Sequence, residues 1–268
     1  MPASNRNSVR IALPSSLGPN AEKRAGQLEA WAKTALGRTV NVVVPPTYEQ
    51  LAKELLLGKV DAAWAPPFVC ARIEAMGVRV LLRGVRNGAS SYRAALVTRA
   101  NAELTIDTLK GTKAIWSDRD SVGGYLLPMA WMREKGLDAA KLFSKQEFAG
   151  SYRKALEAVA AGAADVTSVF APTAKASTEG LTGLTEVWPE AAAQFKVLQF
   201  TDESPNDGVA VSMSTPTALV SELEKMLTAM HQSDSGAAVL RDCFNAEKFE
   251  PAPRMGYRAL YRVALASL

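Results

Sequence analysis

The sequence is poor in cysteine and histidine, with two cysteines and one histidine in 268 residues. Structural zinc sites are usually built from four Cys or His ligands, so this small supply argues against a zinc site. Cys70 and Cys243 each stand among apolar residues, where a free cysteine usually acts as a small buried hydrophobe. A disulfide between them stays open, because spacing alone does not establish one. We expect no metal and no cofactor.

Long hydrophobic runs are missing as well. No apolar run approaches the roughly 20 residues that a membrane-spanning helix needs. The start, MPASNRNSVRIALP, lacks the long apolar stretch of a secretory signal peptide. Two readings stay open: a cytosolic protein, or a periplasmic or other extracytoplasmic protein whose signal has been removed.

Neither sign of charge dominates the chain. The net charge is +4, and the basic residues are interspersed with acidic ones. Without a basic stripe interleaved with stacking aromatics, nucleic-acid binding has little support. The mild positive balance is compatible with an anionic ligand and equally with simple solubility. Hydrophobic residues make up 48% of the chain, enough to fill the core of one large domain or two smaller ones.

The sequence does contain a regular alternation of strand-like and helix-like segments. Short β-rich runs, such as VRIAL (9–13), VNVVVP (40–45) and VDAAWAPP (60–67), alternate with helical segments, several of which end at glycine. TIDTLKGTKAIWS (105–117) is expected to form a turn and a helix before a strand. The tail (217–268) is expected to be mainly helical. Such alternation is typical of an open α/β sheet.

One segment occurs twice. TYEQLAKELLLGKVDAAWAPP starts at Thr47, and SYRKALEAVAAGAADVTSVFAP starts at Ser151. Three residue pairs match at one constant offset: Tyr48 with Tyr152, Gly58 with Gly162, and Asp61 with Asp165. We interpret the aspartates as turn-stabilising residues. Because ligands of open α/β sheets bind at the carboxyl ends of strands, the two copies are interpreted as equivalent half-sites.

The ordered set of these segments resembles type II periplasmic solute-binding proteins, in particular the phosphate/phosphite/phosphonate-binding branch of ABC transporters. The residues that carry the resemblance are TYEQLAKELLLGKVDAAWAPPFVCARIEAMG, SYRAALVTR, LKGTKAIWSDRDSVGGYLLPMAWM, FAGSYRKALEAVAAGAADVTSV and SPNDGVAVS. The resemblance implies an α/β fold of two lobes, each an open mixed sheet flanked by helices, joined by two crossover hinge strands.

The resemblance also implies the domain organisation. Lobe 1 would comprise residues 8–97 and 208–268, and lobe 2 residues 98–207. A small molecule would bind in the cleft between the lobes, which would close over it by a hinge motion. The implied partner is an ABC permease. We further expect a monomer, with no nucleic-acid partner and no membrane-inserted segment.

The resemblance places the ligand near the start of a helix in lobe 2. Family members read Ser-Thr-Ser-Gly-Tyr there and hold a phosphonate with hydroxyl and backbone N–H groups. This chain keeps Ser121 but has Val122 and Gly123 in place of the next two residues. Tyr152 stands where phosphonate binders carry a histidine. Phe170 stands where binders of aminophosphonates carry carboxylates. Because an unpaired ammonium is costly in a closed site, we do not expect 2-aminoethylphosphonate as the ligand.

Aromatic side chains take the place of these polar groups. A cleft lined by aromatic rings favours flat or apolar ligand bodies, although each ring could instead pack in a core. Asn206 is a further possible contact. The complete set of expected ligand contacts is Ser15, Ser16, Tyr48, Trp64, Pro67, Phe68, Tyr92, Ser121, Val122, Gly123, Tyr152, Phe170 and Asp207.

No catalytic motif stands out. The chain has no G-x-S-x-G, H-E-x-x-H or P-loop pattern, and His231 reads as a surface helix residue. Our first hypothesis is a solute-binding protein that captures a small, anionic and possibly aromatic molecule for an ABC-type importer. The alternative is a cytosolic enzyme or ligand sensor built on the same fold.

Overall fold

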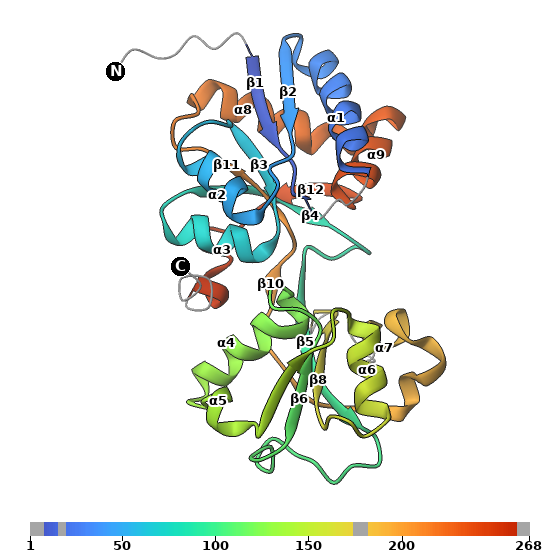
Figure 1. The fold of residues 1–268 in the computed structure, drawn as a ribbon. Helices are drawn as coiled ribbons and strands as arrows, with labels where there is room; N and C mark the ends of the chain where they lie inside the picture. Colours follow the sequence, from blue (N-terminus) through green and yellow to red (C-terminus); the bar gives the residue numbers. More distant parts are fainter. Residues whose placement is uncertain (1–7, 16–19, 174–181, 262–268) are drawn as a thin grey trace. The chain divides into compact units, whose positions relative to one another are not determined.

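The computed structural model describes residues 8–15, 20–173 and 182–261. The chain divides into two compact units (Figure 1). Unit 1 comprises the residues up to Ser90 and those from Pro205 to Tyr261. Unit 2 comprises Ser91–Ser204. The first boundary therefore precedes the one expected after residue 97. The reason is strand β5 (Ser91–Arg99), which pairs with strands β8 and β9 of unit 2.

Unit 1 is built on a six-stranded mixed sheet with the order β12-β4-β11-β3-β1-β2. Its strands are β1 (Ser8–Ala12), β2 (Thr39–Val43), β3 (Ala62–Ala65), β4 (Arg79–Val85), β11 (Gly208–Val211) and β12 (Lys248–Pro251). Strand β1 runs parallel to β2 and β3, whereas β11 runs antiparallel to β3 and β4. The described part of the tail is mainly helical, as expected, and it also contains strand β12, which pairs with β4 at the sheet edge, where a proline is tolerated.

Helices cover the sheet of unit 1. They are α1 (Ala21–Leu36), α2 (Tyr48–Leu56), α3 (Pro67–Ala75), α8 (Thr217–Ala229), η4 (Met230–Gln232), α9 (Asp234–Val239), η5 (Leu240–Phe244) and η6 (Arg258–Leu260). Helices α2 and α3 lie together on one side of the unit, and α1 and α9 lie together on the other (Figure 1).

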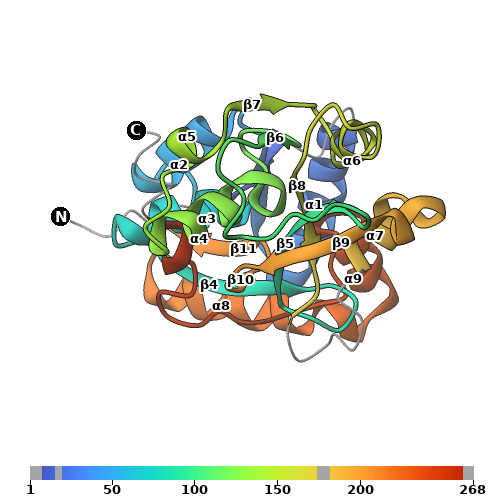
Figure 2. The ribbon, with the colours of Figure 1, turned by 90° about the horizontal axis from the view of Figure 1, so that it is seen from below.

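Unit 2 has a four-stranded sheet of β5, β8 (Thr167–Ala171), β9 (Phe195–Phe200) and β10 (Ser204–Pro205). Strands β6 (Lys113–Trp116) and β7 (Lys145–Phe148) form a parallel pair, and Ala114 of β6 bridges in parallel to Val166 just before β8. The helices are η2 (Val122–Leu126), α4 (Leu127–Glu134), α5 (Ala139–Leu142), α6 (Tyr152–Ala160), α7 (Thr182–Val187) and η3 (Pro189–Gln194). Helices α4 and α5 lie on one side of β5 and β8, and α6 and α7 on the other, as Figure 1 and Figure 2 show.

One expected helix of unit 2 does not form. Residues 105–112 are turns instead. The Thr108 hydroxyl accepts a hydrogen bond from the Thr105 N–H at 3.0 Å, so a side chain competes locally with helical backbone bonding. The remaining alternation follows the sequence, and the two α/β units confirm the predicted fold class.

Candidate functional site

The repeated segment folds in the same way in both units. Helices α2 and α6 each span nine residues and begin with the tyrosine of the repeat. The residue before each tyrosine caps the helix: the Thr47 hydroxyl accepts from the Gln50 N–H at 3.1 Å, and the Ser151 hydroxyl accepts from the Lys154 N–H at 3.3 Å. Such caps fix the first turn of a helix and with it the position of the tyrosine.

The two aspartates of the repeat also make matching contacts. Asp61 Oδ2 accepts from the Arg10 N–H at 2.8 Å, and Asp165 Oδ2 accepts from the Lys113 N–H at 2.8 Å. In each case the aspartate N–H donates back to the carbonyl of the same partner residue, at 2.8 and 2.9 Å. Each aspartate therefore has a structural role, but it ties the segment after the repeated helix to a neighbouring strand, where a turn-stabilising contact was expected.

The start of helix η2 is the most polar feature among the predicted site residues. Helix η2 continues directly into α4, so one helical segment runs from Val122 to Glu134. Ser121 caps it, with its Oγ accepting from the Gly124 N–H at 3.1 Å. The N–H groups of Val122 and Gly123 belong to the first turn, which has no acceptors within the helix. The helix dipole adds partial positive charge at this end.

Tyr152 reaches this helix start from α6. Ser121 Oγ donates a hydrogen bond to the Tyr152 Oη at 3.0 Å, and the Tyr152 ring packs edge-on against Phe170, with ring centroids 5.6 Å apart. Burial raises the pKa of the Tyr152 phenol above its ordinary value, while hydrogen bonds from Ser121 and the backbone of Gly124 act in the opposite direction. The phenol therefore keeps its proton at neutral pH and remains available as a donor.

Two glycines allow this close approach. A Cβ on Gly123 would lie 3.0 Å from the Tyr152 Oη and 3.2 Å from the Phe170 Cβ. A Cβ on Gly124 would lie 1.9 Å from the Ser117 Oγ. The backbone of η2 is thus packed directly against neighbouring hydroxyl groups, as only glycine allows.

Further buried hydroxyls lie in and near the strands of unit 2. Ser168, on β8, donates from its Oγ to the Gly123 carbonyl at 2.7 Å. Within the described residues, Ser117 Oγ and Thr167 Oγ1 are the buried side-chain polar atoms that lack a hydrogen-bond partner. Native proteins satisfy most buried polar groups, so such exceptions call for an explanation.

Several predicted contacts of unit 1 lie at one edge of its sheet. Ser15 follows β1, Tyr48 follows β2, and Pro67 and Phe68 follow β3. These three strands are mutually parallel, so their carboxyl ends share an edge. Tyr48 and Phe68 are half-buried, and Pro67 is buried at the first position of α3. Ser16 lies outside the described residues.

Trp64 corrects one prediction. Its side chain is 3% exposed and packs edge-on against Phe244 and Phe249, at centroid distances of 5.4 and 5.6 Å. Strand β3 is an inner strand of the sheet with all of its residues buried. The ring therefore belongs to the core of unit 1 and not to a ligand-binding surface.

Asp207 and Asn206 are also used within the protein. The Asp207 carboxylate pairs with the Arg86 guanidinium at 2.6 Å. The Asn206 side-chain amide donates to the carbonyls of Gly84 and Ala89, at 3.0 and 2.9 Å. The two hydrogen bonds use both protons of the Asn206 amide, and the ion pair engages the Asp207 carboxylate. They give both residues a structural role within unit 1.

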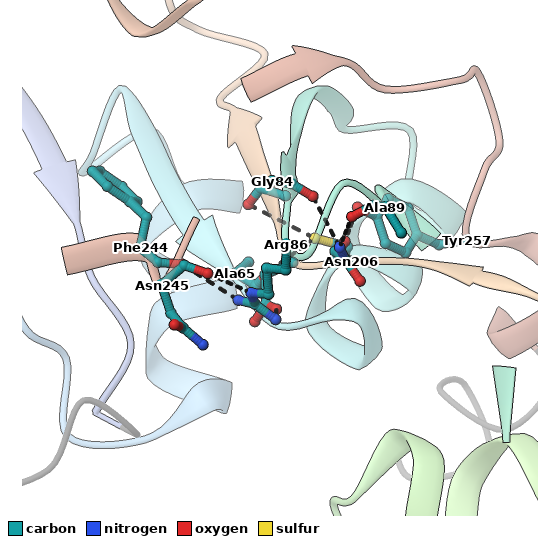
Figure 3. A network of polar contacts seen from close by, with 11 residues as sticks. Ala65, Gly84, Arg86, Ala89, Asn206, Phe244, Asn245 and Tyr257 are labelled. Carbon is teal, nitrogen blue, oxygen red and sulfur yellow. Dashed lines mark hydrogen bonds and ion pairs between the residues drawn. The ribbon is translucent and has the colours of Figure 1, made fainter. Parts of the chain in front are cut away.

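Figure 3 shows this network, which joins the two places where the chain leaves and re-enters unit 1. The Tyr257 hydroxyl donates to the Asn206 carbonyl at 2.6 Å, and the Asn206 N–H donates to the Ser90 carbonyl at 2.9 Å. Arg86 also donates to the carbonyls of Asn245 and Phe244. Arg86 and Tyr257 could not be predicted as part of this network, because nothing in their local sequence indicates partners so distant in the chain.

The other predicted residues are placed as follows. Tyr92 is half-buried on β5, and the Val122 side chain is buried, which leaves its backbone N–H as the group that can contact a ligand. Cys70 and Cys243 are free thiols, so the disulfide left open by the sequence is not formed. No cluster of three or more potential metal ligands occurs among the described residues. In the same part of the chain, no helix has both the length and the apolarity to cross a membrane.

Solved structures share this fold. XAC2383 from Xanthomonas citri, bound to ATP, has 17% sequence identity and a TM-score of 0.77, with 97% of this chain and 96% of that chain covered. PhnD1 from Prochlorococcus marinus, in complex with methylphosphonate, has 16% identity and a TM-score of 0.65, with 98% and 99% covered. A binding protein component of an ABC phosphonate transporter, PA3383 from Pseudomonas aeruginosa, has 18% identity and a TM-score of 0.61, with 98% and 96% covered.

These are proteins with the two-lobed periplasmic-binding fold, and they confirm the architecture expected from the sequence. The sequence itself matches a family described as the periplasmic substrate-binding protein of phosphonate ABC transporters, over residues 11–257. That match covers most of the chain and confirms the resemblance seen in the repeated segments. The chain belongs to the phosphonate-binding family of periplasmic substrate-binding proteins of ABC transporters.

Proposed function

We propose that this protein binds a small anionic molecule in the periplasm and delivers it to the permease of an ABC-type importer. The observation that carries the proposal is the η2 donor set, defined as the N–H groups of Val122 and Gly123 together with the Tyr152 hydroxyl. The two N–H groups lie in the first turn, at the positive end of a helix, and the Tyr152 hydroxyl is hydrogen-bonded to Ser121, which caps that helix. Members of the family are solute-binding proteins rather than enzymes, which confirms that part of the sequence analysis.

The physical basis is the affinity of helix N-termini for anions. Unpaired N–H groups point outward there, and hydrogen bonds from such donors to a charged oxygen are roughly twice as strong as those between neutral groups. Among the ionisable groups that contact this helix start directly, Tyr152 stays neutral and protonated. A negative group would find donors here.

We propose that Tyr48 and Phe68 of unit 1 also contact ligand. Tyr48 holds the same position on α2 that Tyr152 holds on α6, with the same type of helix cap. Phe68 lies in the first turn of α3, beside α2. Half-buried aromatic rings of this kind offer apolar surface to a ligand body.

The ligands of related structures agree with an anionic ligand. Structures of XAC2383 contain ATP or chloride, and the PhnD1 structure contains methylphosphonate. All three are anions near neutral pH, and ATP also carries a flat aromatic base. We propose an anionic ligand with an apolar or aromatic body. Because Phe170 and Ala171 provide no carboxylate for an ammonium group, 2-aminoethylphosphonate is a poor candidate.

Native mass spectrometry of the freshly purified protein tests the proposal directly, because a co-purified small molecule would reveal its class. Isothermal titration calorimetry then measures binding of phosphonates, sulfonates, aromatic acids and ATP. Ligand at about 100 times its Kd should stabilise the fold by about 2.7 kcal/mol, visible as a raised Tm. An adduct-free protein that binds no anion in this panel would contradict the proposed function.

Tyr48 provides a test of the contribution of unit 1. Tyr48→Ala removes an aromatic contact and should weaken binding of the identified ligand by about 10-fold, a typical cost for truncating an interface aromatic residue. Leu57→Ala, at the other end of the same helix and 61% exposed, is the matched control and should leave the affinity unchanged. Equal affinities for the two variants would show that unit 1 does not use Tyr48.

A further inference from the structure

The sheet of unit 1 has an edge that the proposed ligand contacts do not use. It is the edge where the parallel strands β1, β2 and β3 begin, opposite the edge that carries Tyr48 and Phe68. We infer that this edge, here called the amino edge, is a docking surface for a membrane whose lipids carry negatively charged headgroups. The protein rests on such a bilayer as a peripheral protein, whichever ligand it binds.

Exposed apolar side chains gather at the amino edge. The described residues include five exposed large hydrophobic residues, and three of these lie here: Leu57 (61% exposed), Met76 (47%) and Met213 (66%). Leu57 and Met76 directly follow the neighbouring helices α2 and α3, which lead back to the starts of β3 and β4 (Figure 1). Met213 follows β11, which runs antiparallel to β3 and ends beside its start. Grouped exposure of this kind marks interaction sites.

Two of these side chains belong to turns that pack against each other. Gly58 follows Leu57, and a Cβ placed on this glycine would collide with the Ser214 Oγ, next to Met213. Gly58 has a φ of +65°, a conformation that favours glycine. The close approach and the backbone conformation hold the leucine and the methionine at adjoining points of the surface.

Basic side chains lie beside the same turns. Arg10, Lys59 and Arg79 are all exposed. The Arg10 guanidinium donates to the Lys59 carbonyl at 3.4 Å, and Arg79 is the register partner of Val211, two residues before Met213. Within the part of the chain that the structure describes, these three cations form no ion pair. Their charge therefore faces solvent.

The acidic side chains near the amino edge are less available. Asp61 is only 6% exposed, and its carboxylate accepts a hydrogen bond from the Arg10 N–H. Glu222 pairs with Arg38 at 2.7 Å. Glu54 is half-buried and accepts from the side chain of Gln50 at 2.8 Å. The exposed and unpaired charge at this edge is thus positive.

This combination of charge and apolar exposure indicates the partner. Lys and Arg side chains bind the headgroups of anionic lipids, and apolar side chains that enter the headgroup layer add contact area. A second copy of the chain fits less well, because a two-fold symmetric contact places each surface against itself. The cations of one amino edge would then face those of the other.

The test is flotation of the full chain with two kinds of vesicle, made either of phosphatidylcholine alone or of phosphatidylcholine mixed equally with phosphatidylglycerol. We expect binding to the mixed vesicles only, and weaker binding as salt screens the charges. Each Lys or Arg near such a surface contributes roughly fivefold to the affinity, so Lys59→Glu combined with Arg79→Glu should weaken binding by more than about 10-fold.

A second double variant tests the apolar contribution. Leu57→Ser combined with Met213→Ser keeps every charge and should weaken binding to the mixed vesicles by about 10-fold, because two exposed side chains no longer enter the headgroup layer. Binding that is unchanged in this variant would show that the apolar side chains do not contact the bilayer, and the docking surface as defined here would be wrong.

The matched control lies in unit 2. Lys141→Glu combined with Lys145→Glu changes the net charge by the same amount, at side chains that are 85% and 58% exposed. This variant should bind the mixed vesicles as the unmodified chain does. An equal loss in the control would attribute binding to net charge alone and overturn the inference. Circular dichroism melting curves confirm that all variants remain folded.

The remaining outcomes also decide the matter. The inference is overturned if the unmodified chain does not float with the mixed vesicles, or if it floats equally with phosphatidylcholine alone. It is likewise overturned if analytical ultracentrifugation shows a dimer that Leu57→Ser with Met213→Ser dissociates, since the edge then joins two copies. None of these results bears on the proposed function, because ligand affinity, measured by calorimetry, should be the same in every variant.

Discussion

The glycines of η2 show how a single residue determines what can approach a helix start. Gly124 has no side chain, and the Ser117 and Ser121 hydroxyls fill the space that one would need. Gly26, by contrast, lies within α1 with no heavy atom within 4 Å of its would-be Cβ. The same residue type is thus essential for packing at one position and merely a cost in backbone entropy at the other.

Gly124→Ala should therefore destabilise the protein by about 1–3 kcal/mol, because overpacking forces the neighbouring hydroxyls to move. Gly26→Ala should instead stabilise it by about 0.5–1 kcal/mol, the usual helix-propensity gain. Urea unfolding of both variants measures the effects. Adding Ser117→Ala to Gly124→Ala should recover part of the loss, and a loss that is unchanged by this second substitution would contradict the contact assigned to Ser117.

At the residue scale, sequence reasoning worked where contacts are local and failed where they are not. Asp61 and Asp165 were expected to be structural from their position after a helix and a glycine, and the structure shows each bonded to the backbone of a neighbouring strand. Trp64 was predicted to contact ligand, yet its partners Phe244 and Phe249 come from the far end of the chain. No local pattern identifies such partners, because burial depends on which segments pack together.

At the scale of elements, the two chain crossings of unit 1 are held together by one buried asparagine. Asn206 binds Gly84 and Ala89 through its side chain and Ser90 and Tyr257 through its backbone. The segment that leaves the unit and the segment that returns are thereby fixed to each other. We expect this region to be among the more rigid parts of unit 1.

Asn206→Ala should destabilise the protein by about 1–3 kcal/mol, because it leaves the Gly84 carbonyl without this donor in a buried setting. Hydrogen exchange of residues 84–90 and 205–208 should become faster in the same variant. The exposed Asn41, on β2, provides the control: Asn41→Ala should change stability by less than about 0.5 kcal/mol. If the two variants prove equally stable, the network does not hold these crossings.

Most helices and strands could be predicted from the sequence, whereas their boundaries and the edge strand β12 could not. The repeated helices, their caps and their terminal glycines can be read from spacing alone. Strand β12 was missed because four residues ending in proline resemble a loop until β4 pairs with them. The turns at 105–112 were mistaken for a helix because hydrogen bonds by threonine side chains outweigh a weak helical pattern.

At the scale of the whole molecule, buried acidic groups should shape the dependence of stability on pH. Burial raises the pKa of the Cys70 thiol well above its usual range and raises that of Cys243 to about 11. Burial also raises the pKa of the Tyr257 phenol. The folded protein therefore favours the protonated, neutral form of each group.

The sign of the effect follows from these shifts. Unfolded thiols lose their protons near pH 8.5, whereas the folded ones keep them to higher pH, so the unfolded state gains stability as pH rises. We expect the free energy of unfolding to fall progressively from about pH 8.5 to 11, measured by urea unfolding at a series of pH values. The Cys70→Ala and Cys243→Ala variants should show a shallower decline. If the free energy of unfolding of both variants falls with pH as steeply as that of the unmodified chain, the thiols are not the source of the decline.

The sequence by itself determined the class of the protein. The repeat of helix, glycine, aspartate and strand fixes two similar α/β units, because helix caps, positive-φ glycines and strand propensity act over a few residues. It also indicated the family through the order of its segments. Only the tertiary structure decided which side chains meet: Tyr152 with Ser121 and Gly123, Asp207 with Arg86, and Trp64 with the core. Such pairings depend on packing between segments far apart in the chain, and that packing leaves no trace in local spacing.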